Sequence, residues 1–200
     1  MAIITISGNT SGSISLSAPD ISGSNTLTLP VATDTLIGKA TVDTLTNKSI
    51  AATQLTGTIA AAALPAGTVL QVVSAVYSTP ASTATTTLVD TGLTASITPR
   101  SVSSKILVII SQNGVANNII SQGVRISLLR GASVINSPAL YAYYQITLLG
   151  SVSFTTLDSP ATTSATTYKT QFSRSVNNGG TALVNGDNVE SSITLMEIQG

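Results

Sequence analysis

The chain opens with short segments in which apolar and polar residues alternate. The first three are ITI at 4–6, ISL at 14–16 and LTL at 27–29, separated by Gly, Pro, Asn and Ser. Alternation with period two between such residues predicts half-buried β-strands. Burying one Leu or Ile yields about 1.5–3 kcal/mol, while ordering each backbone residue costs about 1–2 kcal/mol. We therefore expect three copies of this extended ribbon to wrap around one axis.

The segment ATDTLIGKATVDTLTNKSI, residues 32–50, repeats a small unit. Asp-Thr-Leu occurs at 34–36 and again at 43–45, and each copy is followed by a lysine, Lys39 or Lys48. Such repetition indicates one structural element used twice. The Ala-rich run that follows, ending at Pro65, favours a narrow neck in which several chains lie close together. A disordered linker is the alternative that the pattern leaves open.

Longer strand candidates begin after Gly67. No segment shows a convincing helical period, although residues 140–149 lack turn residues. Breaks are expected at 90–92, 99–101, 130–131 and 185–188. The candidate strands are 68–78, 85–89, 93–98, 104–112, 123–130, 132–136, 139–149, 151–157, 166–173 and 189–198. Many short strands with frequent turns predict an antiparallel sandwich or jelly roll.

Two of these segments suggest how the sandwich is filled. The run Ile106 to Ile110 is apolar without alternation and is expected at the sandwich centre. In the last segment, Ile193, Leu195 and Ile198 are expected near one face, with Glu197 disturbing the pattern. The predicted fold is all-β: an N-terminal shaft at 1–66 and a jelly-roll-like head at 67–200.

The aromatic residues support this division of the chain. All of them lie between Tyr77 and Phe172, so the first third has no bulky side chain with which to build its own core. A segment that buries so little apolar surface needs partners, and identical copies are the simplest partners. The sequence therefore predicts a homotrimer.

Charge and composition narrow the functional classes. Only 8% of the residues are charged and the net charge is +0, whereas an ordinary domain is about one quarter charged. So few charges indicate that much of the surface lies in subunit contacts, and the lack of a basic stripe argues against nucleic acid. The apolar runs fall short of the roughly 20 residues that cross a bilayer, and the first residues do not resemble a secretory signal. We expect synthesis in a cytoplasm without membrane insertion.

The chain contains no Cys and no His, which excludes thiol catalysis, a histidine base and Cys/His zinc sites. The acids of the second region are Asp90, Asp158, Asp187, Glu190 and Glu197. Several stand in turn sequences, where Asp caps its own backbone. The alternative to this capping role is a pair of carboxylates that cleaves glycans. The sequence predicts no enzyme and no catalytic residue.

The sequence Asn185-Gly186-Asp187-Asn188, with Glu190 nearby, offers oxygen ligands of the kind that calcium prefers. It lacks the full acid spacing of a calcium loop, and a tight Asn-Gly hairpin explains it more simply. We predict no metal and no cofactor.

Tyr141, Tyr143 and Tyr144 form the densest aromatic cluster and are the candidates for surface recognition. Tyrosine is favoured at recognition surfaces. Packing between protomers or in the core is the alternative, with the hydroxyls reaching solvent. Arg125 and Arg130 are expected to form ion pairs across subunits or to lie at the edge of a sheet.

Several long segments resemble known virion proteins. ATDTLIGKATVDTLTNKSI is similar to a short element of tailed-bacteriophage tail fibres, and VSAVYSTPASTATTTLVDTGLTASITP, SSKILVIISQNGV, ISLLRGASVI, LDSPATTSATTYKTQF and SSITLMEI resemble the C-terminal head of phage fibre-type proteins. Together they cover most of residues 31–200. The resemblance implies a homotrimeric virion fibre or appendage with a jelly-roll-like head, and it carries no catalytic motif.

The expectation from sequence is thus a phage virion structural protein. Its N-terminal region would bind another virion protein, in the tail, the neck or the capsid. Its head would adhere to a host-surface glycan or protein. The alternative is a capsid decoration or cement protein that stabilises the shell.

Overall fold

A computed structural model describes residues 3–7, 13–17, 49–51, 53, 56–57, 59–119, 122–137, 149–177 and 179–200. The chain forms two compact units, Met1–Leu55 and Thr56–Gly200. Within the described residues, no helix is long and apolar enough to cross a membrane. The division at residues 66 and 67 into an anchoring region and a head stays a prediction.

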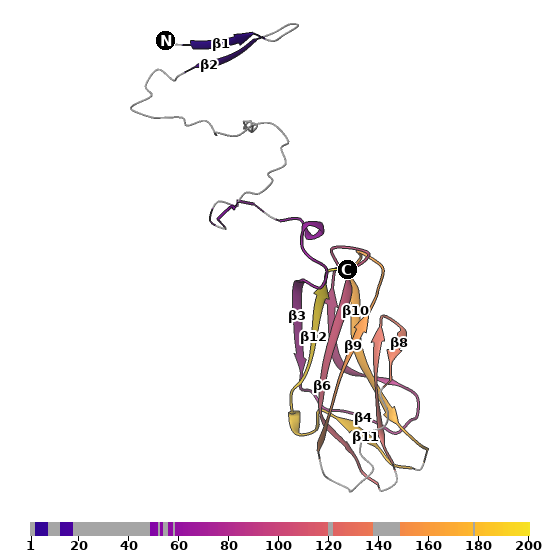
Figure 1. Cartoon of the computed structure of the whole chain (residues 1–200). Coiled ribbons are helices and arrows are strands. Elements are labelled where there is room, and N and C mark those ends of the chain that lie inside the picture. The colour runs from indigo at the N-terminus through magenta and orange to yellow at the C-terminus, as the bar shows by residue number, and fades with distance from the viewer. Residues whose placement is uncertain are drawn as a thin grey trace. The chain divides into compact units, whose positions relative to one another are not determined.

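The first unit contains a two-stranded antiparallel pair (Figure 1). Strands β1 (Ile3–Ser7) and β2 (Ser13–Ser17) pair with Ile4 opposite Leu16 and Ile6 opposite Ile14. The strands expected around 4–6 and 14–16 are therefore confirmed. The third expected strand, at 27–29, and both Asp-Thr-Leu repeats with Lys39 and Lys48 lie outside the described residues.

The second unit is built from β-strands joined by turns and two short 3₁₀ segments, η2 (Ala61–Ala63) and η3 (Gly186–Asn188). Its strands are β3 (Val69–Tyr77), β4 (Ala81–Thr83), β5 (Val89–Ile97), β6 (Lys105–Asn117), β7 (Val124–Arg130), β8 (Ser133–Asn136), β9 (Gly150–Asp158), β10 (Thr166–Arg174), β11 (Ala182–Val184) and β12 (Ser191–Ile198). All of the pairings are antiparallel.

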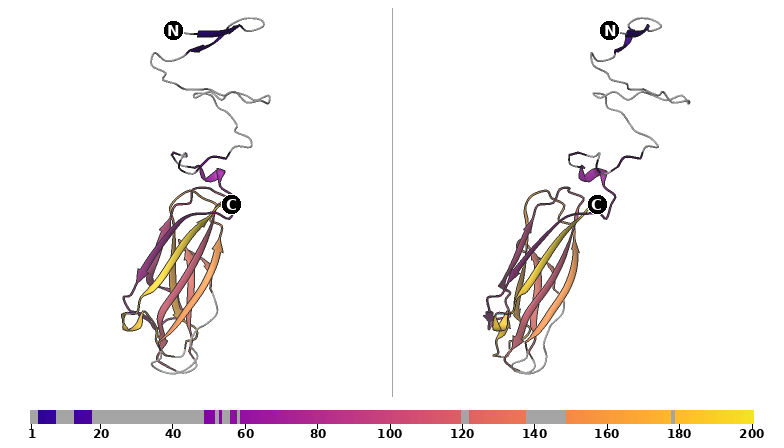
Figure 2. Two further views of the ribbon diagram at one scale, coloured as in Figure 1. Left: turned by 60° about the vertical axis from the view of Figure 1, so that its left-hand side comes forward. Right: turned by 90° about the vertical axis from the view of Figure 1, so that its left-hand side faces the viewer.

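The first sheet is centred on the long strand β6. Strands β12 and β11 follow each other along one edge of β6, and β9 pairs with the other edge. Strands β3 and β4 continue the sheet beyond β12 and β11. The short strands β4 and β11 lie at the end of the unit away from the C-terminus (Figures 1 and 2).

The second sheet has the order β5-β10-β7-β8. The two sheets face each other as a sandwich, because one apolar cluster takes residues from β5, β7 and β10 together with residues from β6 and β12. The predicted all-β fold with antiparallel sheets is confirmed. Along the chain the strands cross repeatedly from one sheet to the other, and this is compatible with the predicted jelly roll.

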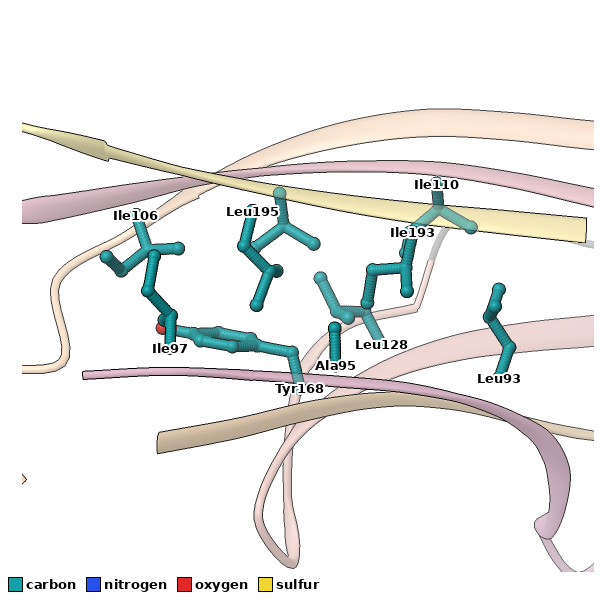
Figure 3. Close-up of a cluster of buried hydrophobic side chains, with 10 residues drawn as sticks. Leu93, Ala95, Ile97, Ile106, Ile110, Leu128, Tyr168, Ile193 and Leu195 are labelled. Atoms are coloured by element: carbon teal, nitrogen blue, oxygen red, sulfur yellow. The ribbon is translucent and has the colours of Figure 1, made fainter. Parts of the chain in front are cut away.

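The interior contains two apolar clusters separated by a polar belt. The larger cluster includes Tyr168 from the second sheet and Ile106, Ile110 and Ile193 from the first sheet, which point toward one another (Figure 3). The smaller cluster surrounds Phe172. On β5, β6 and β10 a polar residue stands between the two clusters, as Thr170 does between Tyr168 and Phe172.

The belt is a closed hydrogen-bond network around Gln112, which is fully buried. Its Nε2 donates to Asn185 Oδ1 at 2.8 Å and to Ser191 Oγ at 2.9 Å. Its Oε1 accepts from Thr170 Oγ1 at 3.0 Å, and that hydroxyl meets Thr91 Oγ1 at 2.6 Å. Buried polar groups cost little when each one finds a partner. This network therefore joins the two sheets where the core is not apolar.

One expected break, at 90–92, is wrong, and the strand expected at 104–112 extends further than predicted. Strand β5 runs through Asp90-Thr91-Gly92 because Gly92, at φ 90°, lets the Tyr77 ring pack directly on its backbone. Strand β6 continues through Asn113 and Gly114 by means of a bulge at Gly114, whose φ is 60°. Glycine supplies the left-handed conformation without a steric penalty, so these sequences read as turns although they lie inside strands.

The sequence 185–188 is not the expected tight hairpin. Strands β11 and β12 do not pair with each other, and both pair with β6. The chain steps away from β6 at Asn185, where the backbone is left-handed, and returns at Ser191. The expectation for β12 is also corrected: Glu197 is buried and takes the inward place after Ile193 and Leu195, while Ile198 belongs to the outward set.

Candidate functional site

The outer face of the first sheet carries a row of apolar side chains across its four long strands β3, β12, β6 and β9. Val72 lies opposite Met196, Met196 opposite Leu107, and Leu107 opposite Leu157. Val72 is 53% exposed and Leu157 is 54% exposed, whereas the inward residues of the same strands are largely buried. We call Val72, Met196, Leu107 and Leu157 the apolar row. It lies near the end of the sheet where the chain enters, since Gly67 and Thr68 bond with Gln199.

The remainder of this outer face is almost uncharged. The next row contains Ser74, Thr194, Ile109 and Thr155, and the following row contains Val76, Ser192, Ser111 and Ser153. Of the outward side chains on the described strands β3, β12, β6 and β9, Lys105 alone is charged. The run 106–110 is thus central, as expected, but Ile109 is 40% exposed.

The outer face of the second sheet is polar and is internally paired. Ser96 meets Thr167 at 2.7 Å, and Thr94 donates to the Tyr168 carbonyl. Asp90 accepts from Lys169 Nζ at 2.8 Å and from Gln171 Nε2 at 2.9 Å. These hydrogen bonds, led by that of Lys169, hold the pKa of Asp90 below its usual value.

Asp158 connects the two sheets. Its carboxylate accepts both contacts of Arg130 Nη1, at 2.9 and 2.8 Å, and its Oδ2 accepts from the Tyr168 hydroxyl at 2.7 Å. Burial, reinforced by the hydrogen bond to Asp158, raises the pKa of Tyr168 well above its usual range. Arg130 therefore pairs within its own chain, and all three groups serve the packing of β7, β9 and β10.

Glu197 closes the opposite side of the sandwich. Its Oε2 accepts from Gln71 Nε2 at 2.6 Å, and its Oε1 accepts from the backbone N–H of Arg100 at 2.6 Å. Burial alone would raise the pKa of this carboxyl. The hydrogen bonds from Gln71 and from the Arg100 N–H outweigh burial and hold the pKa below its ordinary value.

The remaining acids lie near the step between β11 and β12. Asp187 is exposed at φ 54° and lines a surface hollow, and Glu190 is exposed beside it in sequence. Asn185 points inward, because its Oδ1 is taken by Gln112 and Ser191. That oxygen is accordingly not free to serve as a calcium ligand. Across the described ranges, no three His, Cys, Asp or Glu side chains gather to hold a metal.

The structure thus gives the five candidate acids separate surroundings. Asp90, Asp158 and Glu197 are each engaged with their own donors, on different parts of the sandwich. Tyr141, Tyr143 and Tyr144 lie outside the described residues, so their predicted role in recognition stays a prediction. Arg125 is exposed on β7 of the second sheet.

The apolar row is the feature that the sequence analysis missed. The signal was available in β3, whose sequence VLQVVSAVY has apolar residues at both parities of the strand. It was also available in the run 106–110. A strand that is apolar on both faces predicts cover on both faces, and the opposite sheet covers only one of them. No family model matches this chain, and no curated protein matches it either.

Proposed function

We propose that the protein is a bacteriophage virion structural protein that forms a homotrimeric fibre or appendage. Residues 1–66 bind another virion protein and form the shaft, and residues 67–200 form the head that adheres to the host surface. The proposed activity is non-enzymatic recognition. The observation that carries the proposal is the uncharged outer face of the first sheet, with its apolar row.

The partner that best fits this face is a second copy of the chain. Lys105 is the one charge among the outward side chains of the described strands β3, β12, β6 and β9, so copies meet there without desolvating ion pairs or opposing like charges. Contiguous exposed apolar patches mark interaction sites on soluble proteins. The row also lies at the end where the chain enters the sandwich, so copies joined through their N-terminal regions are brought together there.

A trimer accounts for the low charge and for the thin apolar content of the first unit. Three copies around one axis give each ribbon two neighbours against which to bury its few apolar residues. The head then presents three equal surfaces to the host. Several weak sites on one rigid particle raise effective affinity by about 10²–10⁴ without new contacts.

Purified particles of the producing phage test this function. The protein should be a stoichiometric component of the virion, and labelled antibody should locate it on an appendage. Purified protein should also bind host cells and compete with phage adsorption. Absence from particles would contradict the proposal.

The same particles decide the alternative. A capsid decoration protein stabilises capsomer contacts, so it would cover the shell at high copy number and its removal would weaken the capsid. A fibre would occupy few positions, and its removal would abolish adsorption while leaving the capsid stable.

A further inference from the structure

A surface hollow of about 540 Å³ lies at the end of the first sheet away from the chain entry. Its floor is apolar and is formed by Ala116, Leu183 and Leu149. Ala116 and Leu183 are cross-strand neighbours on β6 and β11, and Ser82 lies opposite Leu183 on β4. The hollow therefore belongs to the outer face of the sheet, about 30 Å along β6 from the apolar row.

The rim of the hollow carries hydrogen-bonding groups. Its polar residues are Ser82, Asn117, Asn118, Thr181 and Asp187. Ser82, Asn118 and Asp187 are exposed, so a ligand in the hollow can reach them. A concave site with an apolar floor and a few convergent polar groups is the usual form of a small-ligand site.

The rim is held in place by contacts behind it. The backbone N–H of Thr181 donates to Asn118 Oδ1 at 2.6 Å, and the N–H of Asn118 donates to the Thr181 carbonyl at 3.3 Å. Arg174, only 5% exposed, donates to the Gly180 carbonyl at 2.8 Å and to Asn177 Oδ1 at 2.6 Å. Gly180 and Thr181 are therefore held beside the hollow before a ligand arrives, so a ligand need not order them.

The other side of the rim has an unusual backbone conformation. Asn185, Asp187 and Asn188 all have left-handed φ values, between 54° and 58°. Asn and Asp adopt this conformation more readily than other residues with a side chain, so the cost is small. The polar belt holds Asn185, whereas no hydrogen bond within the described residues holds the Asp187 side chain, which is exposed at the hollow. Strained residues gather at binding sites more often than elsewhere.

The chemistry of the lining selects the ligand. Among the described residues no Lys or Arg lines the hollow, and Asp187 adds a negative charge, so phosphate and acidic sugars are disfavoured. Hydroxyl and amide groups suit a ligand rich in hydroxyls, and the aliphatic floor suits the C–H face of a sugar ring. An amino sugar gains an ion pair with Asp187.

We propose that this hollow binds a neutral or amino sugar of a host-surface polysaccharide. The proposal rests on the adhesive function proposed above and names the site that performs it. The copies contact each other at the chain-entry end of the face, and the sugar binds at the opposite end.

Methyl NMR of the full-length protein, labelled at leucine methyl groups, tests the site. The probes are glucose, galactose, mannose, N-acetylglucosamine and glucosamine, with sialic acid as the acidic control. The Leu149 and Leu183 methyl signals should shift with at least one neutral or amino sugar, while Leu157 should not respond. Sialic acid should produce no shift. Failure of all five sugars to shift Leu149 and Leu183 overturns the proposal.

Three substitutions sharpen the test. Ser82→Trp fills the hollow from an exposed strand position and should weaken binding at least tenfold, whereas Ser96→Trp, exposed on the second sheet far from the hollow, should bind normally. Asp187→Asn tolerates the left-handed backbone and should weaken glucosamine binding severalfold while sparing neutral sugars. Unchanged affinity in a folded Ser82→Trp protein, or unchanged glucosamine affinity in Asp187→Asn, contradicts the site. Particle location and trimer formation are measured separately, so the site can fail while the virion function stands.

Discussion

The two outer faces of the sandwich are built from the same kind of strand and yet differ in their chemistry. On the second sheet, outward hydroxyls pair with each other and Asp90 binds Lys169. On the first sheet, the apolar row is more than half exposed at its two ends, Val72 and Leu157. On β5 and β10 of the second sheet the outward polar groups find partners in the same chain, whereas the two ends of the apolar row on the first sheet stay exposed. This difference is the main reason to expect further copies of the chain on the first face.

The largest expected effect comes from placing charge on the two faces in turn. Val72→Glu with Leu157→Glu should disrupt the trimer and weaken association on the order of a hundredfold or more, because the new carboxylates lose water without gaining a partner. Thr94→Glu with Ser96→Glu, a matched pair on the second face, should leave the trimer intact. Sedimentation of the full-length proteins measures both. Equal behaviour of the two pairs would remove the distinction between the faces.

Two left-handed glycines, Gly114 and Gly131, differ in how tightly their surroundings enclose them. A Cβ at Gly114, in the bulge of β6, would lie 2.3 Å from the backbone nitrogen of Gly186. Gly114→Ala should therefore lower the free energy of unfolding by about 3 kcal/mol or more. Gly131, between β7 and β8, has a similar φ of 58° with open space around it. Gly131→Ala should cost only about 1–2 kcal/mol, and urea unfolding of both variants checks the contrast.

Glu197 supplies the pH dependence of the first sheet. Its pKa in the folded protein is lowered, so its contribution to stability is present above its unfolded pKa and is lost as the pH falls through the folded pKa. Glu197→Gln should cost about 1–3 kcal/mol at pH 7. The difference from the wild type should shrink under acid, below the ordinary value of 4.5. A difference in unfolding free energy that stays constant from pH 7 to that acid range contradicts this assignment.

Asp90 provides the weaker counterpart on the second face. Its pKa is lowered in the same direction, but its side chain is 58% exposed. Water and salt screen such a pair, so Asp90→Asn should cost less than about 1 kcal/mol, and the cost should fall at high salt. Thermal melts at low and high salt measure it. A loss as large as that of Glu197→Gln would show that exposure does not separate the two carboxylates.

Periodicity predicted most of the strands in the second unit. Residues 68–78, 123–130 and 166–173 correspond closely to β3, β7 and β10, because each has a buried apolar set with period two. Strands β4 and β11 were missed, since each is only three residues long and is held by its neighbours rather than by its own pattern. Of the strand expected at 85–89, only the last residue, Val89, lies in a strand, as the first residue of β5.

The candidate site was harder to predict than the fold. Nothing in the local sequence reveals that Ala116, Leu183 and Ser82 meet, because they come from strands far apart in the chain. Glycines inside β5 and β6 resemble turns until the ring over Gly92 and the backbone beside Gly114 are seen. Glu197 interrupts an apolar pattern and is explained only by the Arg100 amide and Gln71, which are distant in sequence.

The central claim is that other copies of the chain cover the apolar row. Hydroxyl-radical footprinting of the full-length protein tests it directly, with Val134 on the second face as the internal reference at 49% exposure, close to that of Val72 and Leu157. The account predicts a species of three times 20.2 kDa in which Val72, Leu157 and Met196 react much more slowly than Val134. A 20.2 kDa species in which Val72 and Leu157 react as fast as Val134 would contradict it.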